Sequence, residues 1–145
     1  MKDLNILELI DFCSREWRQL IELLAKQHKL TFLEWRILVC ICAANKIEQQ
    51  VLTKQLNLLS NNTITNVDSL VKKGFLKKTI KTSDKKIRIL TLTKKKEGTV
   101  KQIKKLNDQI YRSCFSRFDK EAVSMLEDGV WKTLESLREI HDKFI

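Results

Sequence analysis

The sequence predicts a mainly α-helical protein with one small β-hairpin, and two observations lead to this fold class. The 145 residues include three glycines and no proline, so the chain lacks the turn-forming residues that a β-sandwich or barrel needs. Apolar residues recur at helical spacing along most of the chain and alternate in strand fashion only around residues 75–92. A hydrophobic share of 43% is typical of a globular domain.

Two helices open the predicted fold. Residues 4–26 carry apolar side chains on one stripe, as an amphipathic helix does. Thr31 is then typical of an N-cap, with Glu34 three residues later as its capping-box partner, and we expect a second helix over residues 32–44. Because this helix is apolar nearly all round, we expect it to be buried at the centre of the protein.

A short helix and a longer polar helix follow. The short helix is expected to start at Thr53 or a neighbouring residue and to end at Leu56. Ser60 is the N-cap candidate of the longer helix, which continues to Lys73 and stops at Gly74. Glycine is the usual residue after the last turn of a helix because it adopts positive φ without steric cost.

A β-hairpin and two more helices complete the order. Residues 75–80 and 87–92 predict two strands, joined by the polar residues 82–85. Helical spacing returns after the second strand, and Asp119 is the expected cap of the last helix. The predicted order is H-H-H-H-E-E-H-H. Because no repeat or low-complexity linker interrupts it, we expect a single domain over residues 1–145.

The positive charge is concentrated in the middle of the chain. The formal net charge is +10, but residues 1–50 hold seven basic and seven acidic side chains, and residues 106–145 hold six and eight. Residues 51–105 hold fifteen basic and three acidic side chains. A solvated lysine face is one interpretation of this segment. A surface that binds a polyanion, above all nucleic acid, explains the asymmetry better.

The basic segment coincides with the short helix, the polar helix and the β-hairpin, which together predict a winged helix-turn-helix. In this arrangement the second helix enters a major groove, and the hairpin, or wing, lies along the neighbouring backbone or minor groove. The segment also carries a set of motifs in a fixed order: Leu30-Thr31 with Trp35; Leu52, Leu56 and Leu58; Val67-Asp68 with Leu70; Lys73-Gly74-Phe75-Leu76; Asp84-Lys85-Lys86 at the wing tip; and Leu92-Thr93.

With these motifs the middle of the chain resembles the MarR family of bacterial winged-helix transcription regulators. Lys86 stands at the wing where that family usually has arginine. The resemblance implies a DNA-binding part over residues 30–99 and a helical part, residues 1–29 and 100–145, through which two copies pair. We therefore expect a homodimer that binds a pseudo-palindromic operator in double-stranded DNA. We expect it to act as a transcriptional repressor in the cytoplasm.

Two groups of residues are expected to contact DNA. The first turns of the polar helix carry no Arg or Lys, whereas asparagine bonds bidentately to adenine and threonine contacts the thymine methyl group, so we expect an A/T-rich operator. The alternative for Ser60 and Asn61 is capping alone, and the alternative for Thr63 is a place in the core. The expected base-reading residues are Ser60, Asn61, Asn62, Thr63, Thr65 and Asn66. The expected backbone contacts, at the wing and its approach, are Lys54, Lys81, Lys85, Lys86 and Arg88.

The helical part is expected to form the dimer interface, because three helices with long apolar stripes would leave apolar surface exposed in one protomer. Trp131 and Phe144 are candidates for this interface, and a place in the core of one protomer is their alternative. The resemblance also implies a small aromatic ligand between the helical and winged parts. Its candidate lining residues, for which a role in the core is the alternative, are Trp17, Phe32, Trp35 and Arg36.

Several other chemistries are not expected. The sequence has no Gly-rich phosphate loop, nucleophile elbow or His-Glu metal pair, so we expect no enzyme activity. It has no Cys-x-x-Cys, and its two histidines are far apart, so we expect no zinc site and no cofactor. We interpret Cys13 as a buried, unreactive thiol. The longest apolar run has eight residues, too short for a membrane helix, and residues 1–10 lack the pattern of a signal peptide.

One alternative function stays open at this point. The winged helix could instead bind a protein partner, or start replication on a mobile element. The lysine-rich wing argues against a purely protein-binding role, since lysines interact with phosphates whatever the sequence. The salt dependence of binding to duplex DNA separates these alternatives, because it is steep for a DNA-binding surface and flat for a protein-binding module.

Overall fold

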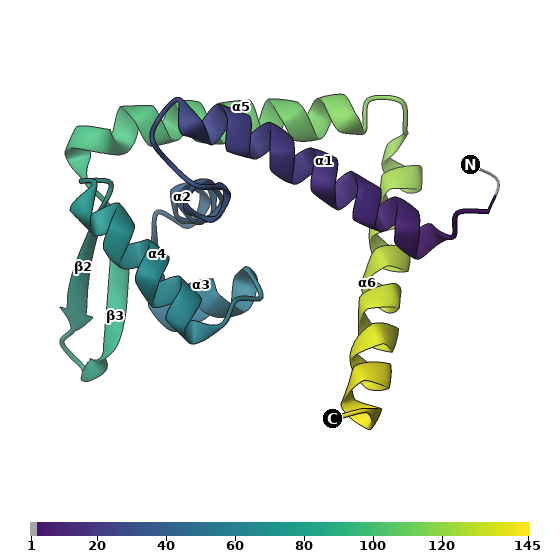
Figure 1. Cartoon of the computed structure of the whole chain (residues 1–145). Coiled ribbons are helices and arrows are strands. Elements are labelled where there is room, and N and C mark those ends of the chain that lie inside the picture. Colours follow the sequence, from purple (N-terminus) through teal and green to yellow (C-terminus); the bar gives the residue numbers. More distant parts are fainter. Residues whose placement is uncertain (1–2) are drawn as a thin grey trace. The chain divides into compact units, whose positions relative to one another are not determined.

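A computed structural model describes residues 3–145 of the chain. Within these residues the chain forms six α-helices and a three-stranded antiparallel sheet, so the predicted mainly helical fold with a small β-hairpin is confirmed (Figure 1). The chain divides into two compact units, one up to Leu106 and the other from Asn107 to Ile145. None of the described helices is both long enough and apolar enough to cross a membrane.

The first unit carries most of the elements, and α5 continues from it into the second unit. The elements of the first unit are α1 (Ile6–Lys26), α2 (Phe32–Ala44), β1 (Lys46–Glu48), α3 (Gln49–Gln55), α4 (Ser60–Lys72), β2 (Leu76–Lys81), β3 (Asp84–Leu92), the short 3-10 helix η1 (Lys94–Lys96) and the start of α5 (Glu97–Cys114). The second unit comprises the rest of α5 and α6 (Lys120–Lys143).

Local caps define the helix starts that the sequence predicts. The Thr31 hydroxyl accepts from the Glu34 N–H at 3.1 Å, and the Glu34 carboxylate accepts from the Thr31 N–H at 2.9 Å, which confirms the capping box of α2. Asp119 caps α6 through the Ala122 N–H at 2.8 Å, also as predicted. A second capping box, which the sequence analysis did not identify, starts α1 and joins Asn5 and Glu8.

Helix α2 forms the centre of the first unit, as predicted. It packs against α1, α4, β1 and β3, and its apolar residues on nearly every side are buried. Trp35, Ile37, Leu38 and Ile41 are each at most 1% exposed. Burial of such side chains contributes roughly 1.5–3 kcal/mol each relative to an exposed position, so α2 holds the elements around it in place.

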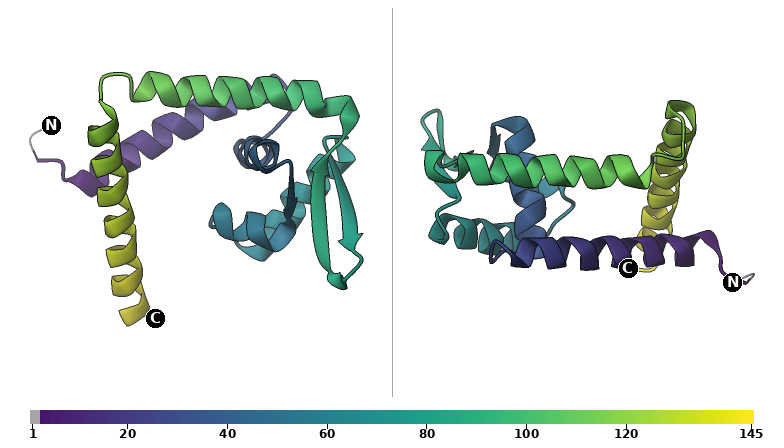
Figure 2. Two further views of the ribbon diagram at one scale, coloured as in Figure 1. Left: turned by 180° about the vertical axis from the view of Figure 1, so that it is seen from behind. Right: turned by 90° about the horizontal axis from the view of Figure 1, so that it is seen from above.

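The sheet has three strands in the order β1-β3-β2, and β3 is its central strand (Figure 2). The hairpin β2–β3 is confirmed, although β3 starts at Asp84, earlier than predicted, and the turn is correspondingly shorter. Strand β1 was not predicted, because three residues are too few to show an alternating pattern. Its Ile47 lies opposite Leu90 of β3, and both side chains are buried.

Two predicted helix starts are wrong. Helix α3 begins at Gln49 rather than at Thr53, because it starts directly where β1 ends, with Glu48 at its N-cap. Ser60 is the first residue inside α4 and not its N-cap, and no side chain caps this helix. The N-cap position belongs to Leu59, which is extended. The predicted stop at Gly74 is confirmed by its φ of +84°.

The second unit is poor in core and rich in exposed apolar surface. No residue of α6 is buried. Trp131 is 61% exposed and Phe144 is 85% exposed, so the alternative that they form the core of one protomer is wrong. An open recess of about 300 Å³ lies between the end of α5 and α6, and its lining residues are Tyr111, Phe115, Val123, Leu126, Glu127, Val130, Trp131 and Leu134.

Candidate nucleic-acid interface

Helices α3 and α4 form a helix-turn-helix whose two helices are joined by a hydrogen bond between threonine hydroxyls. The hydroxyl oxygens of Thr53 on α3 and Thr63 on α4 are hydrogen-bonded at 2.9 Å. Asn57 makes the turn between the helices with a φ of +53°. Because Thr63 is fully buried in this contact, the prediction that it reads bases is wrong and its alternative, a place in the core, is correct.

The outward face of α4 carries most of the other predicted base-reading residues. Asn61, Asn62 and Thr65 are exposed, and Asn66 is half-buried. Two of them donate hydrogen bonds to their own helix: the Thr65 hydroxyl to the Asn61 carbonyl at 2.9 Å, and the Asn66 amide to the Asn62 carbonyl at 2.7 Å. In this state the Thr65 hydroxyl offers only its acceptor side to a ligand, because its one hydrogen is already used.

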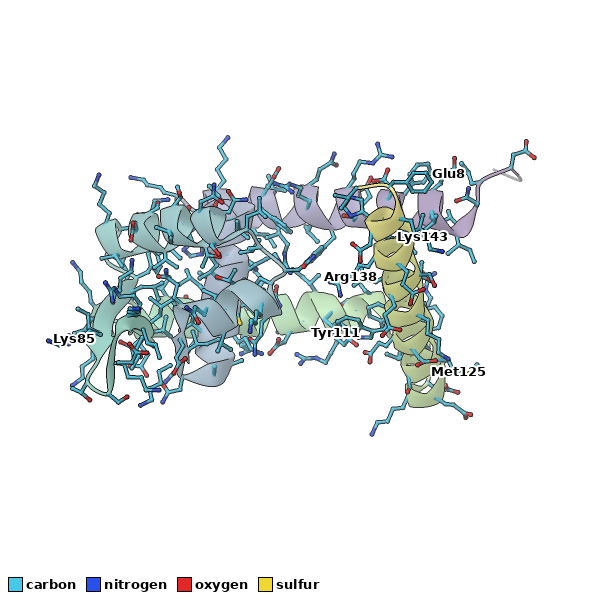
Figure 3. The ribbon with its side chains drawn as sticks, turned by 90° about the horizontal axis from the view of Figure 1, so that it is seen from below. Glu8, Lys85, Tyr111, Met125, Arg138 and Lys143 are labelled. Carbon is cyan, nitrogen blue, oxygen red and sulfur yellow. The ribbon has the colours of Figure 1, made fainter. Side chains whose placement is uncertain are left out.

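The wing tip is ordered by hydrogen bonds and leaves its lysines free. The Lys86 N–H donates to the Asp84 carboxylate at 3.0 Å, and the Arg88 guanidinium donates to the Lys85 carbonyl at 2.7 Å. Lys85 and Lys86 are exposed, and Figure 3 shows Lys85 pointing away from the end of the hairpin. Lys81, by contrast, is paired with Glu48 at 2.9 Å, so its charge is largely compensated.

A recess of about 430 Å³ lies between α3, the start of α4 and β3 of the wing. It brings together three of the residues that were predicted to contact the DNA backbone, Lys54, Lys86 and Arg88. Ser60, which was predicted to read bases, also lines it. No carboxylate lines it, so the recess is positively charged and open to solvent. We refer to this site as the wing recess, and its lining residues are Gln49, Gln50, Thr53, Lys54, Ser60, Ile64, Lys86 and Arg88.

Part of the positive charge in the middle of the chain is used inside the protein. The Lys73 ammonium contacts both oxygens of Glu34, at 2.8 and 2.9 Å, and also the Lys29 carbonyl at 2.8 Å. The Ser69 hydroxyl donates to the same carboxylate at 2.8 Å. Lys78 is paired with Asp68 at 2.8 Å. These lysines therefore contribute less to an anion-binding surface than their number in the sequence indicates.

Glu34 is a buried carboxylate that stays ionised. Its side chain is 1% exposed. Burial alone would raise its pKa, but hydrogen bonds from Lys73, the Thr31 N–H and Ser69, together with the charge of Lys73, bring the pKa below its usual value. The sequence indicates only the capping role of Glu34, because its partners on α4 are distant in the chain.

Three of the four predicted ligand-lining residues meet where α1 packs on α2. The rings of Trp17 and Phe32 make an edge-to-face contact with centroids 5.2 Å apart. The Arg36 guanidinium lies 5.3 Å from the centre of the Trp17 ring and 5.7 Å from that of Phe32. Burial lowers the pKa of Arg36. Trp35 is 1% exposed and belongs to the core, so the prediction that Trp35 lines a ligand site is wrong.

The cysteines differ in their surroundings. Cys13 is exposed on α1, so the prediction that it is buried is wrong for the single chain. The Cys40 thiol donates to the Gln55 side chain at 3.0 Å, and burial raises its pKa, while Arg36 opposes this shift. Within residues 3–145, no group of three or more His, Cys, Asp or Glu side chains is arranged to hold a metal ion.

Ile64 is a residue of the candidate surface that was not predicted from the sequence. Ile64 lies in the wing recess and is 44% exposed. A signal for this was present, because helical spacing places Thr63, Val67 and Leu70 on one face of α4 and Ile64 outside it. The missing information was which side of α4 faces the wing.

Comparisons with known proteins agree with this geometry. The sequence model of the MarR family matches residues 30–87, which span α2 to the start of β3. A MarR protein from Peptoclostridium difficile is 23% identical, with 99% of this chain and 94% of that chain covered and a TM-score of 0.81. The transcription regulator MarR from Oenococcus oeni is 20% identical, with 90% and 99% covered and a TM-score of 0.83.

A third similar structure contains nucleic acid. The MepR–DNA complex of Staphylococcus aureus is 18% identical to this chain, with 93% of this chain and 99% of that chain covered and a TM-score of 0.81. At these identities the likeness establishes the fold, a winged helix-turn-helix with long helices at both ends of the chain.

Proposed function

We propose that this chain, a MarR family winged-helix protein, binds double-stranded DNA as a homodimer and represses transcription from the promoter that it covers. The observation that carries the proposal is the wing recess, where Lys54, Lys86 and Arg88 come together without any carboxylate. Phosphates of the DNA backbone are the ligands that such a surface attracts. A cytoplasmic location follows from the proposal, since the chromosome of a bacterium lies there.

Affinity and specificity are expected to come from different residues. The free lysines of the wing and α3, with Arg88, position the protein on the backbone and carry no sequence information. The exposed Asn61 and Asn62 of α4 are suited to adenine, which favours an A/T-rich operator. Sequence selection on random duplex DNA tests this, and G/C-rich sequences at the helix contacts would contradict it.

Removing wing charges is expected to flatten the salt dependence of DNA binding. In a homodimer, Lys85→Gln removes one phosphate contact from each protomer, and each contact accounts for roughly 0.9 of the slope of log affinity against log salt. The slope should therefore fall by about two, as measured by fluorescence anisotropy at several salt concentrations. The control is Lys132→Gln in the second unit. The Lys132 ammonium is paired with Asp128 at 2.8 Å, so this variant should leave the salt slope unchanged.

The same measurement separates the proposal from a protein-binding role of the winged helix. A wild-type slope near zero would favour a winged helix that binds a protein partner, and equal slopes for Lys85→Gln and wild type would remove the wing tip from the interface. A replication-initiation module would also bind duplex DNA. In vitro transcription separates that role, because a repressor bound over a promoter should lower transcript yield without any replication protein.

A homodimer is supported by exposed apolar surface in both units. In the first unit, α1 exposes Ile6 by 72% and Leu23 by 65%. In the second, Val130 is 46% exposed and Trp131 is 61% exposed. Apolar surface of this kind on several helices is typical of an interface with a second copy. Sedimentation velocity should give about twice the 17.1 kDa of one chain, and a monomer at all concentrations would contradict the proposal.

We also propose that a small aromatic acid binds where Arg36 meets Trp17 and Phe32. A half-buried guanidinium over two rings offers both a charge for a carboxylate and a surface for a ring. Benzoate, as a probe, should quench tryptophan fluorescence saturably and weaken DNA binding. Arg36→Met should weaken benzoate binding about tenfold or more, because a hydrogen bond to a charged group is lost.

Arg15→Met is the matched control for the ligand test. Arg15 lies 5.2 Å from the Phe12 ring on α1 and is paired with Asp11, so it repeats the arginine–aromatic contact at an exposed position. It should leave benzoate binding unchanged. Equal affinities of the Arg36→Met variant and the wild type would contradict the proposed ligand site.

A further inference from the structure

Helix α4 exposes a hydrocarbon side chain in an otherwise polar recess. Ile64 is 44% exposed and lines the wing recess. Each of the other seven lining side chains carries a nitrogen or oxygen atom, so Ile64 is the one purely apolar group that a ligand in this recess would meet.

The position of Ile64 suits contact with a base rather than with the protein core. Its neighbours Thr63 and Val67 face inward and are fully buried, whereas Ile64 is turned to the flank of α4 that faces the wing. The cations of the same recess, Lys86 and Arg88, attract the phosphate backbone. A backbone held there brings the edges of its own bases to α4, the helix that the fold presents to a major groove.

Among the groups that base edges present in the major groove, one is a hydrocarbon: the C5 methyl of thymine. Contact between this methyl and a branched side chain removes apolar surface of both from water. Burial of one methyl-sized group favours binding by a factor of roughly four. Contact of the same side chain with a cytosine edge gains less, because that edge has a hydrogen atom at C5 and an amino donor next to it.

The polar residues next to Ile64 use part of their hydrogen-bonding capacity inside α4, so the contribution of Ile64 to base recognition becomes more important. The hydrogen of the Thr65 hydroxyl is bound to the Asn61 carbonyl, and one amide hydrogen of Asn66 is bound to the Asn62 carbonyl. These side chains reach a base with fewer free donors than their types offer. Ile64 needs no such partner, so its contact with DNA does not compete with a bond inside the helix.

We propose that Ile64 contacts a thymine methyl group and is a specificity-determining residue of the DNA surface. The inference rests on the proposed function and goes beyond it by naming the chemical group that one side chain reads. It makes the operator preference depend on thymine at one position of each half-site, in addition to adenine contacts of the asparagines.

Replacement of thymine by uracil tests the inference, because uracil differs from thymine only in lacking the methyl group. The tightest duplex selected from a random pool is synthesised with uracil at one thymine position at a time. The wild-type full chain is expected to lose roughly three- to fivefold in affinity at one position of each half-site. Ile64→Ala changes both protomers, so it should bind the thymine duplex about as weakly as the wild type binds a duplex with uracil at that position of both half-sites, and it should not discriminate between thymine and uracil.

Val71→Ala is the matched control. Val71 is 38% exposed on the same helix but does not line the wing recess, so this variant should keep the wild-type discrimination between thymine and uracil. Circular dichroism of each variant confirms that the helices are intact. Ile64→Val, which keeps a branched side chain, should keep most of the discrimination.

The outcomes distinguish this inference from the proposed function. If Ile64→Ala still discriminated between thymine and uracil, the inference would be overturned and the proposed DNA binding would stand. The same holds if the wild type bound all thymine and uracil duplexes with equal affinity. If persistent discrimination in Ile64→Ala came with an equal loss of affinity on both duplexes, Ile64 would contribute to DNA binding without reading the methyl group, and the inference would also be overturned. No salt-dependent binding to any selected duplex would overturn the proposed function, and the inference with it.

Discussion

Lys73→Met is expected to lower the free energy of unfolding at pH 7 by about 2–4 kcal/mol. The variant leaves the Glu34 carboxylate, which is 1% exposed, without its charged partner. Loss of one partner of a fully buried ion pair costs about 3–5 kcal/mol. We expect a loss around and below the lower end of this range, because Lys73 is 34% exposed and the Thr31 N–H and the Ser69 hydroxyl still donate to the carboxylate. Urea denaturation measures the change.

Lys78→Met is the control for this comparison. It removes a lysine that is paired with Asp68 at the same N–O distance of 2.8 Å, but the Asp68 carboxylate is 60% exposed. Exposed ion pairs contribute about 0–1 kcal/mol, so this variant should be nearly as stable as the wild type. Equal losses in the two variants would show that the burial of Glu34 does not matter.

The cost of Lys73→Met should also depend on pH. In the folded wild type the pKa of Glu34 is below its usual value, so its contribution to stability is complete above the usual carboxylate pKa and is lost as the pH falls from there through the lowered pKa of the folded state. Without Lys73, burial becomes the main influence and raises the pKa of Glu34. At low pH the Glu34 carboxylate of the variant is therefore protonated, and the cost of an unpaired buried charge disappears. The difference between variant and wild type should therefore be smaller at pH 4 than at pH 7.

Trp131→Asp is expected to dissociate the homodimer and, as a consequence, to abolish tight binding to a pseudo-palindromic site. A tryptophan at the centre of an interface contributes about 2 kcal/mol or more. In a two-fold dimer the loss counts twice, so the dimer dissociation constant should rise roughly a thousandfold. The single chain should keep its helices, because Trp131 is 61% exposed. Sedimentation velocity and circular dichroism measure the two effects.

Ser136→Asp is the control for the dimer variant. It adds the same charge to an exposed position of the same helix without removing apolar surface. On a helix, Ser136 lies about 140° away from Trp131, so it faces another side. A wild-type monomer, or a Trp131→Asp variant that stays dimeric, would contradict the role given to this face of α6.

Local signals in the sequence predict much of this fold, and long-range contacts explain what they miss. The caps Thr31 and Asp119 act within three residues, so their helix starts could be predicted. Strand β1 could not, because it exists only through its pairing with β3, more than forty residues later. The same holds for the start of α3, which is set by the end of that strand.

In the candidate site, too, features that depend on local sequence could be predicted and features that depend on long-range contacts could not. The sequence predicts the basic segment and the wing, since composition and alternation suffice for both. It could not separate the free Lys86 from Lys73, whose partner Glu34 is 39 residues away in the chain. It left Thr63 with two alternatives, because the side of α4 that packs on α3 is decided by the angle between the helices. Identification of Ile64 as a lining residue depended on the same angle.

The hydrogen-bonded hydroxyls of Thr53 and Thr63 have a consequence for the thermodynamics of association. A hydrogen bond of 2.9 Å is directional, whereas two methyl groups in contact could slide past each other. Helices α3 and α4 are therefore oriented before any DNA arrives, and their relative motion loses little entropy when the complex forms. The ordering cost is concentrated in the long side chains at the wing tip, where each immobilised lysine costs about 0.5–1.5 kcal/mol.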